Sequence, residues 1–115
     1  MAKNSNKGRG GFDEIIYKEI GINQLILFCM YSMDLDREKC TFERLIKECF
    51  TLFPKAFCFS RYAQWPDSRK LDRPLRTLRN KRLIRGDPAS SFVLTQKGKK
   101  EARELTKILT QKKLW

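Results

Sequence analysis

The most constraining feature of this sequence is a run of apolar side chains at helical spacing in residues 42–53. They fall at positions i, i+3, i+4, i+7, i+8 and i+11 and are Phe42, Leu45, Ile46, Cys49, Phe50 and Phe53. This spacing places them on one face of an α-helix. Thr41 precedes the run as a suitable N-cap, and Pro54 follows it as a helix breaker. A helix with one apolar face needs other elements to cover it, so we expect a packed core.

The composition sets the size of that core and removes several kinds of chemistry. A chain of 115 residues that is 41% hydrophobic has material for one domain. The sequence contains no histidine, which excludes histidine-based catalytic triads and mixed Cys/His zinc sites. No apolar run approaches the length of a membrane span, and residues 1–11 do not resemble a secretory signal. We therefore expect a cytoplasmic protein that is not an enzyme and uses neither cofactor nor membrane.

The charge of the chain is large and unevenly distributed. Twenty-five Lys and Arg against thirteen Asp and Glu leave a net charge of +12. Residues 61–115 hold sixteen of the basic and five of the acidic residues, whereas residues 12–60 hold six and eight. This asymmetry predicts a neutral body and a basic binding face, and hence a polyanion or an acidic protein as partner.

The basic half contains a segment with two opposite faces. On a helix over residues 68–80, Arg69, Arg73, Arg76 and Asn80 fall together, and Leu71, Leu75 and Leu78 fall on the opposite side. Asp67 is the expected N-cap, although Pro74 means that the helix is kinked there or begins at Asp72. Such a helix docks on a core through leucine and presents guanidinium groups, which bind guanine edges and phosphates with two parallel hydrogen bonds.

The remaining elements follow from breakers and caps. Residues 1–11 read as a flexible basic arm, and residues 12–20 as a short helix or extended segment. Residues 22–33 are apolar on nearly every side, which predicts a buried helix with Asn23 as a cap. Residues 83–95 read as a hairpin with a turn at Gly86-Asp87-Pro88 that continues to Ser91. Thr95 then caps a last helix over about 96–112, whose early lysines we expect to face a partner: Lys97, Lys99 and Lys100.

Two groups of residues allow more than one interpretation. Cys29, Cys40, Cys49 and Cys58 lack zinc-ribbon spacing, so buried reduced thiols are favoured over a four-thiolate zinc site or a redox sensor. The aromatic residues that follow Pro54 are favoured as core over a platform for stacking bases, and they are Phe57, Phe59, Tyr62 and Trp65.

The order of helix, helix, basic helix, hairpin and helix resembles the winged helix-turn-helix family over about residues 22–110. The stretch from residue 73 to residue 100 is similar to the second half of that family, in which a leucine-spaced helix leads into Leu-Ile, a wing and an aromatic-x-Leu-Thr-x-Lys-Gly step. The matching residues are Leu75, Leu78, Leu83, Ile84, Phe92, Leu94, Thr95, Lys97 and Gly98. The position before Leu83 is commonly glycine in such proteins and is Arg82 here.

The resemblance implies a mainly α fold with a small β-hairpin (α+β), as one winged-helix domain over residues 12–115. It implies a recognition helix at about 68–81, a wing at about 83–95 and binding of double-stranded DNA by a prokaryotic or phage-type transcriptional regulator. The residues assigned to DNA contact are Arg69, Lys70, Arg73, Arg76, Arg79, Asn80, Lys81, Arg85 and Ser90.

Three alternatives stay open at this point. The basic face could instead bind an acidic protein, as an adaptor in a larger restriction or defence assembly. The aromatic segment could bind RNA or a single strand, in which case Trp65 would matter more than Arg76. A homodimer could form through the C-terminal helix, with Leu114 and Trp115 in the contact, and would read an inverted repeat.

Overall fold

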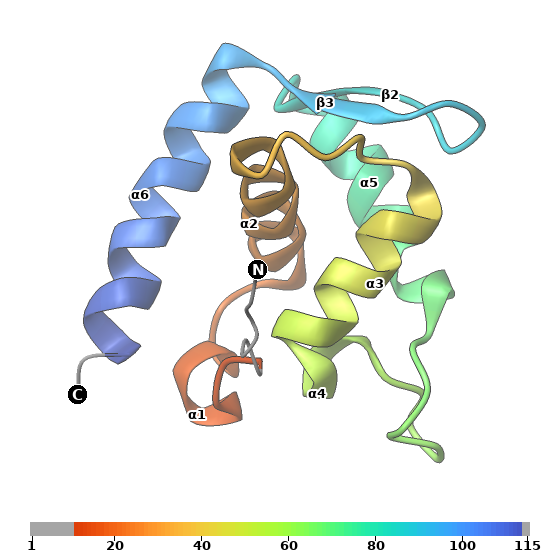
Figure 1. Cartoon of the computed structure of the whole chain (residues 1–115), viewed down its shortest axis with the longest axis vertical. Coiled ribbons are helices and arrows are strands. Elements are labelled where there is room, and N and C mark those ends of the chain that lie inside the picture. The colour runs from red at the N-terminus through yellow and green to blue at the C-terminus, as the bar shows by residue number, and fades with distance from the viewer. Residues whose placement is uncertain (1–10, 114–115) are drawn as a thin grey trace.

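The apolar segment predicted as a buried helix forms the centre of the fold. The structure is a computed structural model that describes residues 11–113. Helix α2 (Ile22–Leu35) packs against α3 (Phe42–Leu52), α5 (Asp72–Asn80) and α6 (Gln96–Lys113), and Figure 1 shows these helices around it. Its buried residues point in several directions and are Leu25, Ile26, Leu27, Cys29, Met30 and Met33. The helix begins after Gly21, so Asn23 lies inside the first turn and is not the cap.

The N-terminal segment is helical and docks on α3. Helix α1 (Glu14–Tyr17) is capped by Asp13, which settles the open choice for residues 12–20. Phe12 donates its backbone N–H to the Leu52 carbonyl (2.8 Å), and its ring stacks on Phe53 with centroids 5.3 Å apart. Of the predicted arm, residues 1–10 lie outside the described residues. The last residue of that arm, Gly11, lies so close to the Thr51 carbonyl that a side chain there would collide with it.

The predicted amphipathic helix is confirmed as α3. Thr41 is its N-cap, because the Thr41 hydroxyl accepts the Arg44 N–H at 3.3 Å. The short helix α4 (Pro54–Phe57) follows directly, and residues 58–66 form a loop before the next helical segment. That loop projects from the body in Figure 1.

The predicted helix over residues 68–81 is divided in two. Residues Ser68–Leu71 form a 3₁₀ turn, η1, and α5 begins at Asp72. Asp67 caps η1 by accepting the Arg69 N–H at 3.1 Å. Pro74 lies in the first turn of α5, where a backbone N–H has no partner within the helix anyway, so Pro74 breaks no helical hydrogen bond. Starting the α-helix late is how the chain accommodates this proline.

The predicted hairpin is present as strands β2 (Ile84–Gly86) and β3 (Phe92–Leu94). The strands are antiparallel, with Ile84 opposite Leu94 and Arg85 opposite Val93. Phe92 also forms a bridge with Cys40, so the hairpin is anchored to the segment that precedes α3. Gly86 has a φ of 113°, and a side chain there would collide with the Ser91 carbonyl. The turn therefore requires glycine at this position.

Helix α6 begins where the hairpin ends. The Thr95 hydroxyl accepts the Gly98 N–H (3.1 Å), which confirms the predicted cap, and it lies 2.7 Å from the Arg82 carbonyl. Gly98 lies so close to the Leu83 carbonyl that a side chain would not fit. These contacts fix the first turn of α6 against the end of α5. The described chain is thus mainly helical with one small two-stranded antiparallel sheet, an α+β fold.

Candidate nucleic-acid interface

The two-faced character predicted for the basic helix is confirmed for α5. Its inner face buries Pro74, Leu75 and Leu78, and Arg73, Arg76 and Asn80 are exposed on its outer face. Within residues 11–113 these three exposed side chains form no hydrogen bond or ion pair. They are therefore available to a ligand without breaking an internal contact.

Arg69 differs from the rest of the predicted stripe because an acidic side chain holds it. Its Nε lies 3.1 Å from Asp67 Oδ1, a second guanidinium nitrogen lies 3.3 Å from Oδ2, and its Cζ stands 5.5 Å from the centre of the Phe59 ring. The guanidinium lowers the pKa of Asp67, and the carboxylate raises the pKa of Arg69. This pairing fixes the start of η1 and neutralises the charge of Arg69, so Arg69 is a poorer candidate for contact than the sequence predicts.

The end of α5 is closed by a backbone motif with an unusual residue. The N–H of Leu83 bonds the Leu78 carbonyl (3.0 Å) and the N–H of Arg82 bonds the Arg79 carbonyl (2.9 Å), which is the Schellman arrangement. Arg82 is left-handed in this motif, with a φ of 60°. Glycine is the residue usually found at this position. Arginine instead places an exposed cation there, and its backbone is strained.

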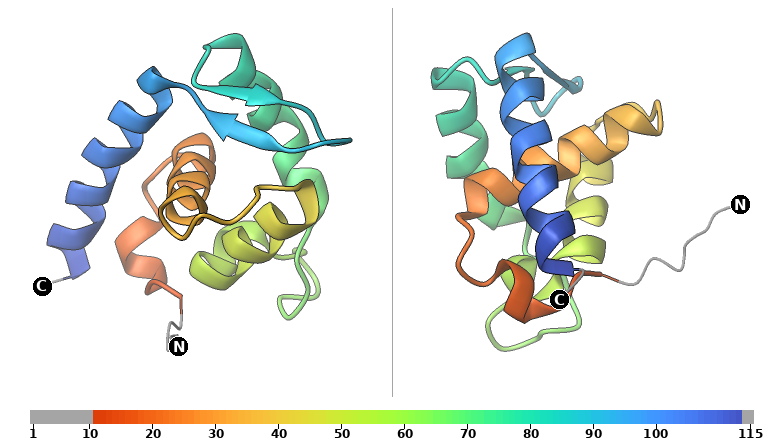
Figure 2. Two further views of the ribbon diagram at one scale, coloured as in Figure 1. Left: turned by 45° about the horizontal axis from the view of Figure 1, so that its top comes forward. Right: turned by 90° about the vertical axis from the view of Figure 1, so that its left-hand side faces the viewer.

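Four basic residues from α5, the turn after it, β2 and α6 line one hollow at this end of α5. The hollow has a volume of about 500 Å³ and is lined by Arg79, Arg82, Ile84, Arg85, Thr95, Gln96 and Lys97. Arg79 also donates to the Gly86 carbonyl at 3.2 Å, which ties α5 to the hairpin. Figure 2 shows the three contributing elements, α5, the hairpin and the start of α6, meeting at the top of the molecule. No carboxylate lines this hollow, which we call the arginine hollow.

Two members of the arginine hollow were not predicted as site residues. In the sequence, Arg82 stands out as a departure from a position where glycine is common. Lys97 is one of three lysines that are expected to face a partner. The positive φ of Arg82 depends on how α5 ends, and the hollow forms only when α6 docks beside β2. A sequence signal did exist for Lys97, because lysine in the first turn of a helix opposes the helix dipole.

The predicted wing residues have different surroundings. Arg85 is exposed on β2 and lies beside the exposed Val93 of β3, on the outer face of the hairpin. The Ser90 hydroxyl donates to Asp87 Oδ1 at 3.3 Å, and the same oxygen accepts the N–H groups of Ala89 and Ser90. Asp87 therefore organises the tip and places a negative charge there. Arg85 remains a strong candidate for contact, whereas Ser90 already has a partner.

Three further lysines are separated from the arginine hollow. Lys70 is half-buried in η1. Lys81 lines a different hollow, together with Asn23 of α2 and Glu101 of α6. Lys99 lies 4.0 Å from Asp34 of α2 and forms a partly exposed ion pair with it, so Lys99 is a poorer candidate for contact with a partner than the sequence predicts.

Only two of the four aromatic side chains that follow Pro54 pack against the rest of the fold. Phe57 is buried and Phe59 is half-buried, as expected, but Tyr62 and Trp65 are 51% and 53% exposed. The prediction that all four rings belong to the core is therefore wrong for these two. Their loop closes on itself before reaching the core, because the Phe59 N–H bonds the Trp65 carbonyl at 3.0 Å.

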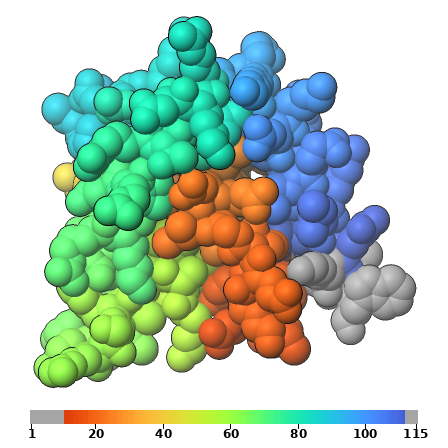
Figure 3. Space-filling model, turned by 180° about the vertical axis from the view of Figure 1, so that it is seen from behind, coloured from red at the N-terminus to blue at the C-terminus, as the bar shows by residue number. Residues whose placement is uncertain are grey.

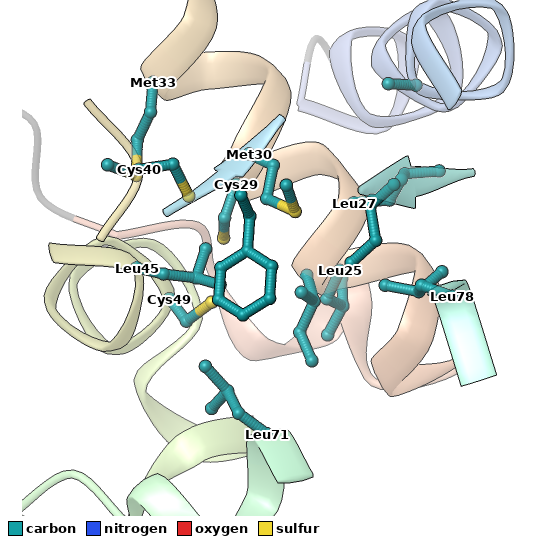
Figure 4. Close-up of a cluster of buried hydrophobic side chains, with 14 of the residues drawn as sticks. Leu25, Leu27, Cys29, Met30, Met33, Cys40, Leu45, Cys49, Leu71 and Leu78 are labelled. Carbon is teal, nitrogen blue, oxygen red and sulfur yellow. The ribbon is translucent and has the colours of Figure 1, made fainter. Parts of the chain in front are cut away.

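The four cysteines are buried, and none of them forms a disulfide. Cys29, Cys40 and Cys49 come from α2, the segment before α3 and α3 itself, and Figure 4 shows them within the core cluster. Burial raises the pKa of Cys40 to about 12 and raises that of Cys29 well above its ordinary value. Among residues 11–113 no group of three or more Cys, Asp or Glu side chains is placed to hold a metal ion.

The C-terminal helix offers one exposed apolar side chain to a second copy. Ile108 on α6 is 47% exposed, whereas Leu105 and Leu109 are buried against the core. Leu114 and Trp115, the other residues expected in a dimer contact, lie outside the described residues. None of the described helices is long and apolar enough to cross a membrane.

Comparisons with known proteins returned no similar protein. No protein-family model matches this chain, and no curated protein or solved structure gives a significant match to it. The arrangement of the described residues is therefore the basis for assigning a function.

Proposed function

We propose that this protein binds double-stranded DNA through the outer face of α5, the arginine hollow and the β2–β3 hairpin. The observation that carries the proposal is the lining of the hollow, which includes Arg79, Arg82, Arg85 and Lys97 and, among the described residues, no acidic one. Four basic residues on one surface without a carboxylate among them attract a polyanion. Phosphate oxygens are the natural ligands of such a group.

The outer face of α5 would supply the contacts to bases. Arg73, Arg76 and Asn80 are exposed, free of internal partners and carried by a helix whose other side is buried. The major groove is wide enough for an α-helix, and arginine and asparagine distinguish guanine and adenine edges there. Phosphate contacts at the hollow would then set the position of α5 in the groove.

The proposed architecture is a winged helix, with α5 as recognition helix and the hairpin as wing. Three features support it: the hairpin follows α5 directly, Cys40 bridges to β3 beside it, and Arg82 is left-handed at the position where the family commonly has glycine. Regulation of transcription in a prokaryote or phage is the use of DNA binding that we propose for it.

A salt titration tests DNA binding directly. Binding of the full chain to a random-sequence duplex is measured by fluorescence anisotropy at about 50 and about 200 mM salt, because displacement of counterions makes phosphate binding steeply salt-dependent. Arg73→Ala/Arg76→Ala should weaken binding at least about tenfold. The matched control is Lys18→Ala/Lys47→Ala, which removes the same charge from exposed positions on α3 and beside α1.

Two results would contradict the proposal. One is the absence of duplex binding at the lower salt concentration despite the charge of +12. The other is an equal loss of affinity in the control variant, which would mean that net charge alone attracts DNA. Either result would favour the adaptor, and capture of an acidic protein by the wild-type chain but not by Arg73→Ala/Arg76→Ala would support that alternative.

A further inference from the structure

The loop between α4 and η1, residues 58–66, is a closed and well-defined structure. Cys58 and Pro66 form a bridge at its base, where the Asp67 N–H also bonds the Phe57 carbonyl at 2.7 Å. Nearer the tip, the Trp65 N–H bonds the Tyr62 carbonyl at 3.0 Å. We call residues 58–66 the aromatic loop. Its hydrogen bonds hold the tip in one conformation, so the exposure of its side chains is built into the fold.

The tip presents two aromatic rings to solvent. The rings of Tyr62 and Trp65 stack with centroids 5.1 Å apart and an angle of 29° between their planes. Each side chain is about half exposed. The rings contact each other on one side, and the exposed half of each side chain is available to a ligand. Among the described residues, every other large exposed apolar side chain is aliphatic, so this pair is the distinctive feature of the surface.

The charge around the aromatic loop selects an anionic partner. Arg61 is exposed beside Tyr62, and Lys55 is exposed on α4. No Asp or Glu occurs from residue 49 to residue 66. Asp67, the next carboxylate along the chain, is paired with Arg69. A ligand with flat aromatic faces and negative charge fits this surface, and a nucleic-acid strand has both properties.

The aromatic loop is continuous with the proposed DNA interface. Figure 3 shows the chain from the loop through α5 to the hairpin as one strip along one side of the molecule, coloured from light green to teal. In Figure 2 the loop and the hairpin lie at opposite ends of α5. A duplex bound along α5 and the hairpin would therefore extend toward the loop at its other end.

We propose that Tyr62 and Trp65 stack on unpaired bases, so that the ligand of this protein is duplex DNA that carries a single-stranded segment. The proposal rests on the DNA binding inferred above. Base faces inside a duplex are covered by their neighbours, so an aromatic pair of this kind can stack only on a terminal or unpaired base. The duplex portion engages α5 and the arginine hollow, and the single strand passes over the aromatic loop.

Fluorescence of Trp65 provides the test. The sequence contains two tryptophans, so Trp115→Phe in the full chain leaves Trp65 as the only tryptophan. The probes are a blunt duplex and the same duplex with a single-stranded thymidine extension on one strand or the other. We expect the extended duplex to quench Trp65 and to bind more tightly than the blunt one. The blunt duplex, whose only open base faces are at its two ends, should bind with much less quenching.

Substitutions then separate this proposal from the first one. Trp65→Ala and Tyr62→Ala should each reduce affinity for the extended duplex by about 5- to 160-fold, the range typical for loss of one stacked base, and leave blunt-duplex affinity unchanged. Trp65→Phe should retain most of the affinity. Ile15→Ala, which truncates an exposed apolar side chain on α1, is the control and should affect neither probe.

The outcomes are distinguishable. Equal binding of the two probes, or an equal loss on both in Trp65→Ala, would overturn the role of the aromatic loop while leaving duplex binding intact. Failure of the wild-type chain to bind either probe would overturn both proposals. Tight binding of the extended duplex that depends on Trp65, together with blunt-duplex binding that depends on Arg73 and Arg76, would support both.

Discussion

Arg82 places a positive charge on the surface of the protein although its backbone conformation is strained. Its φ of 60° is a conformation that non-glycine residues adopt only with strain. Arg37, at the end of α2, has a φ of 58° in the same kind of closing motif, because the Glu38 N–H bonds the Met33 carbonyl at 2.9 Å. The two arginines share a backbone conformation but differ in location, since only Arg82 lines the arginine hollow.

Replacement of each of these arginines by glycine separates stability from binding. Arg82→Gly and Arg37→Gly should both stabilise the fold by about 0.5–1 kcal/mol, because glycine adopts the left-handed conformation without strain. Thermal unfolding measures this effect. Only Arg82→Gly should weaken duplex binding, with the slope of log affinity against log salt concentration smaller by about one. Equal binding by the two variants would show that Arg82 makes no phosphate contact.

At the scale of elements, the hairpin depends on one glycine. Gly86 starts the turn with a φ of 113°, and a side chain there would meet the Ser91 carbonyl. The same residue accepts the hydrogen bond from Arg79 that joins the hairpin to α5. The position of the hairpin and the position of an arginine in the hollow are thus coupled through a single backbone carbonyl.

Gly86→Ala should therefore disturb both stability and binding. We expect a loss of about 1–3 kcal/mol in the free energy of unfolding, from backbone strain and the collision, and weaker duplex binding because Arg79 and Arg85 shift. Denaturant unfolding and anisotropy measure the two effects. Gly21→Ser is the control: Gly21 has an ordinary φ of –62° and room for a side chain, and serine is a good N-cap, so stability should not fall. A stable Gly86→Ala protein would refute the strained turn.

The elements also show where sequence patterns succeed and fail. Helix α3 and its cap Thr41 were predictable because periodicity and capping involve residues within a few positions of one another. The same holds for the turn at Gly86 and the start of α6 at Thr95. The exposure of Tyr62 and Trp65 was not predictable. Aromatic rings favour a core on composition alone, but the point at which the loop closes decides whether they reach it.

At the scale of the whole molecule, the core is built around α2 and contains the sulfur atoms of three cysteines. Cys29 and Cys49 are fully buried, and burial holds the Cys29 pKa well above its ordinary value. A thiol with a raised pKa stays protonated at neutral pH, and a protonated thiol neither reacts readily with oxidants nor binds zinc. The core therefore has to open before this sulfur chemistry can occur.

Thiol labelling tests that conclusion. In the native protein, Cys29 and Cys49 should react with a thiol reagent only at the rate of global unfolding, and in denaturant all four cysteines should react at once. Peptide mapping after brief alkylation identifies the modified residues. Zinc should leave the thermal midpoint unchanged. Fast native labelling of Cys29 at neutral pH, or stabilisation by zinc, would contradict the buried-thiol interpretation and reopen the metal and redox alternatives.

The sequence by itself determined helices α3 and α6 with their caps Thr41 and Thr95, the hairpin turn and the basic character of the C-terminal half. These depend on interactions between residues close together in the chain or on simple sums of charge. Only the tertiary structure decided which cations act together. Arg79, Arg82, Arg85 and Lys97 line one hollow because Thr95 and Gly98 dock the start of α6 on Arg82 and Leu83, next to β2. The net charge can be summed from the sequence. A binding site requires charged side chains to lie close together in space, and that depends on how distant elements pack.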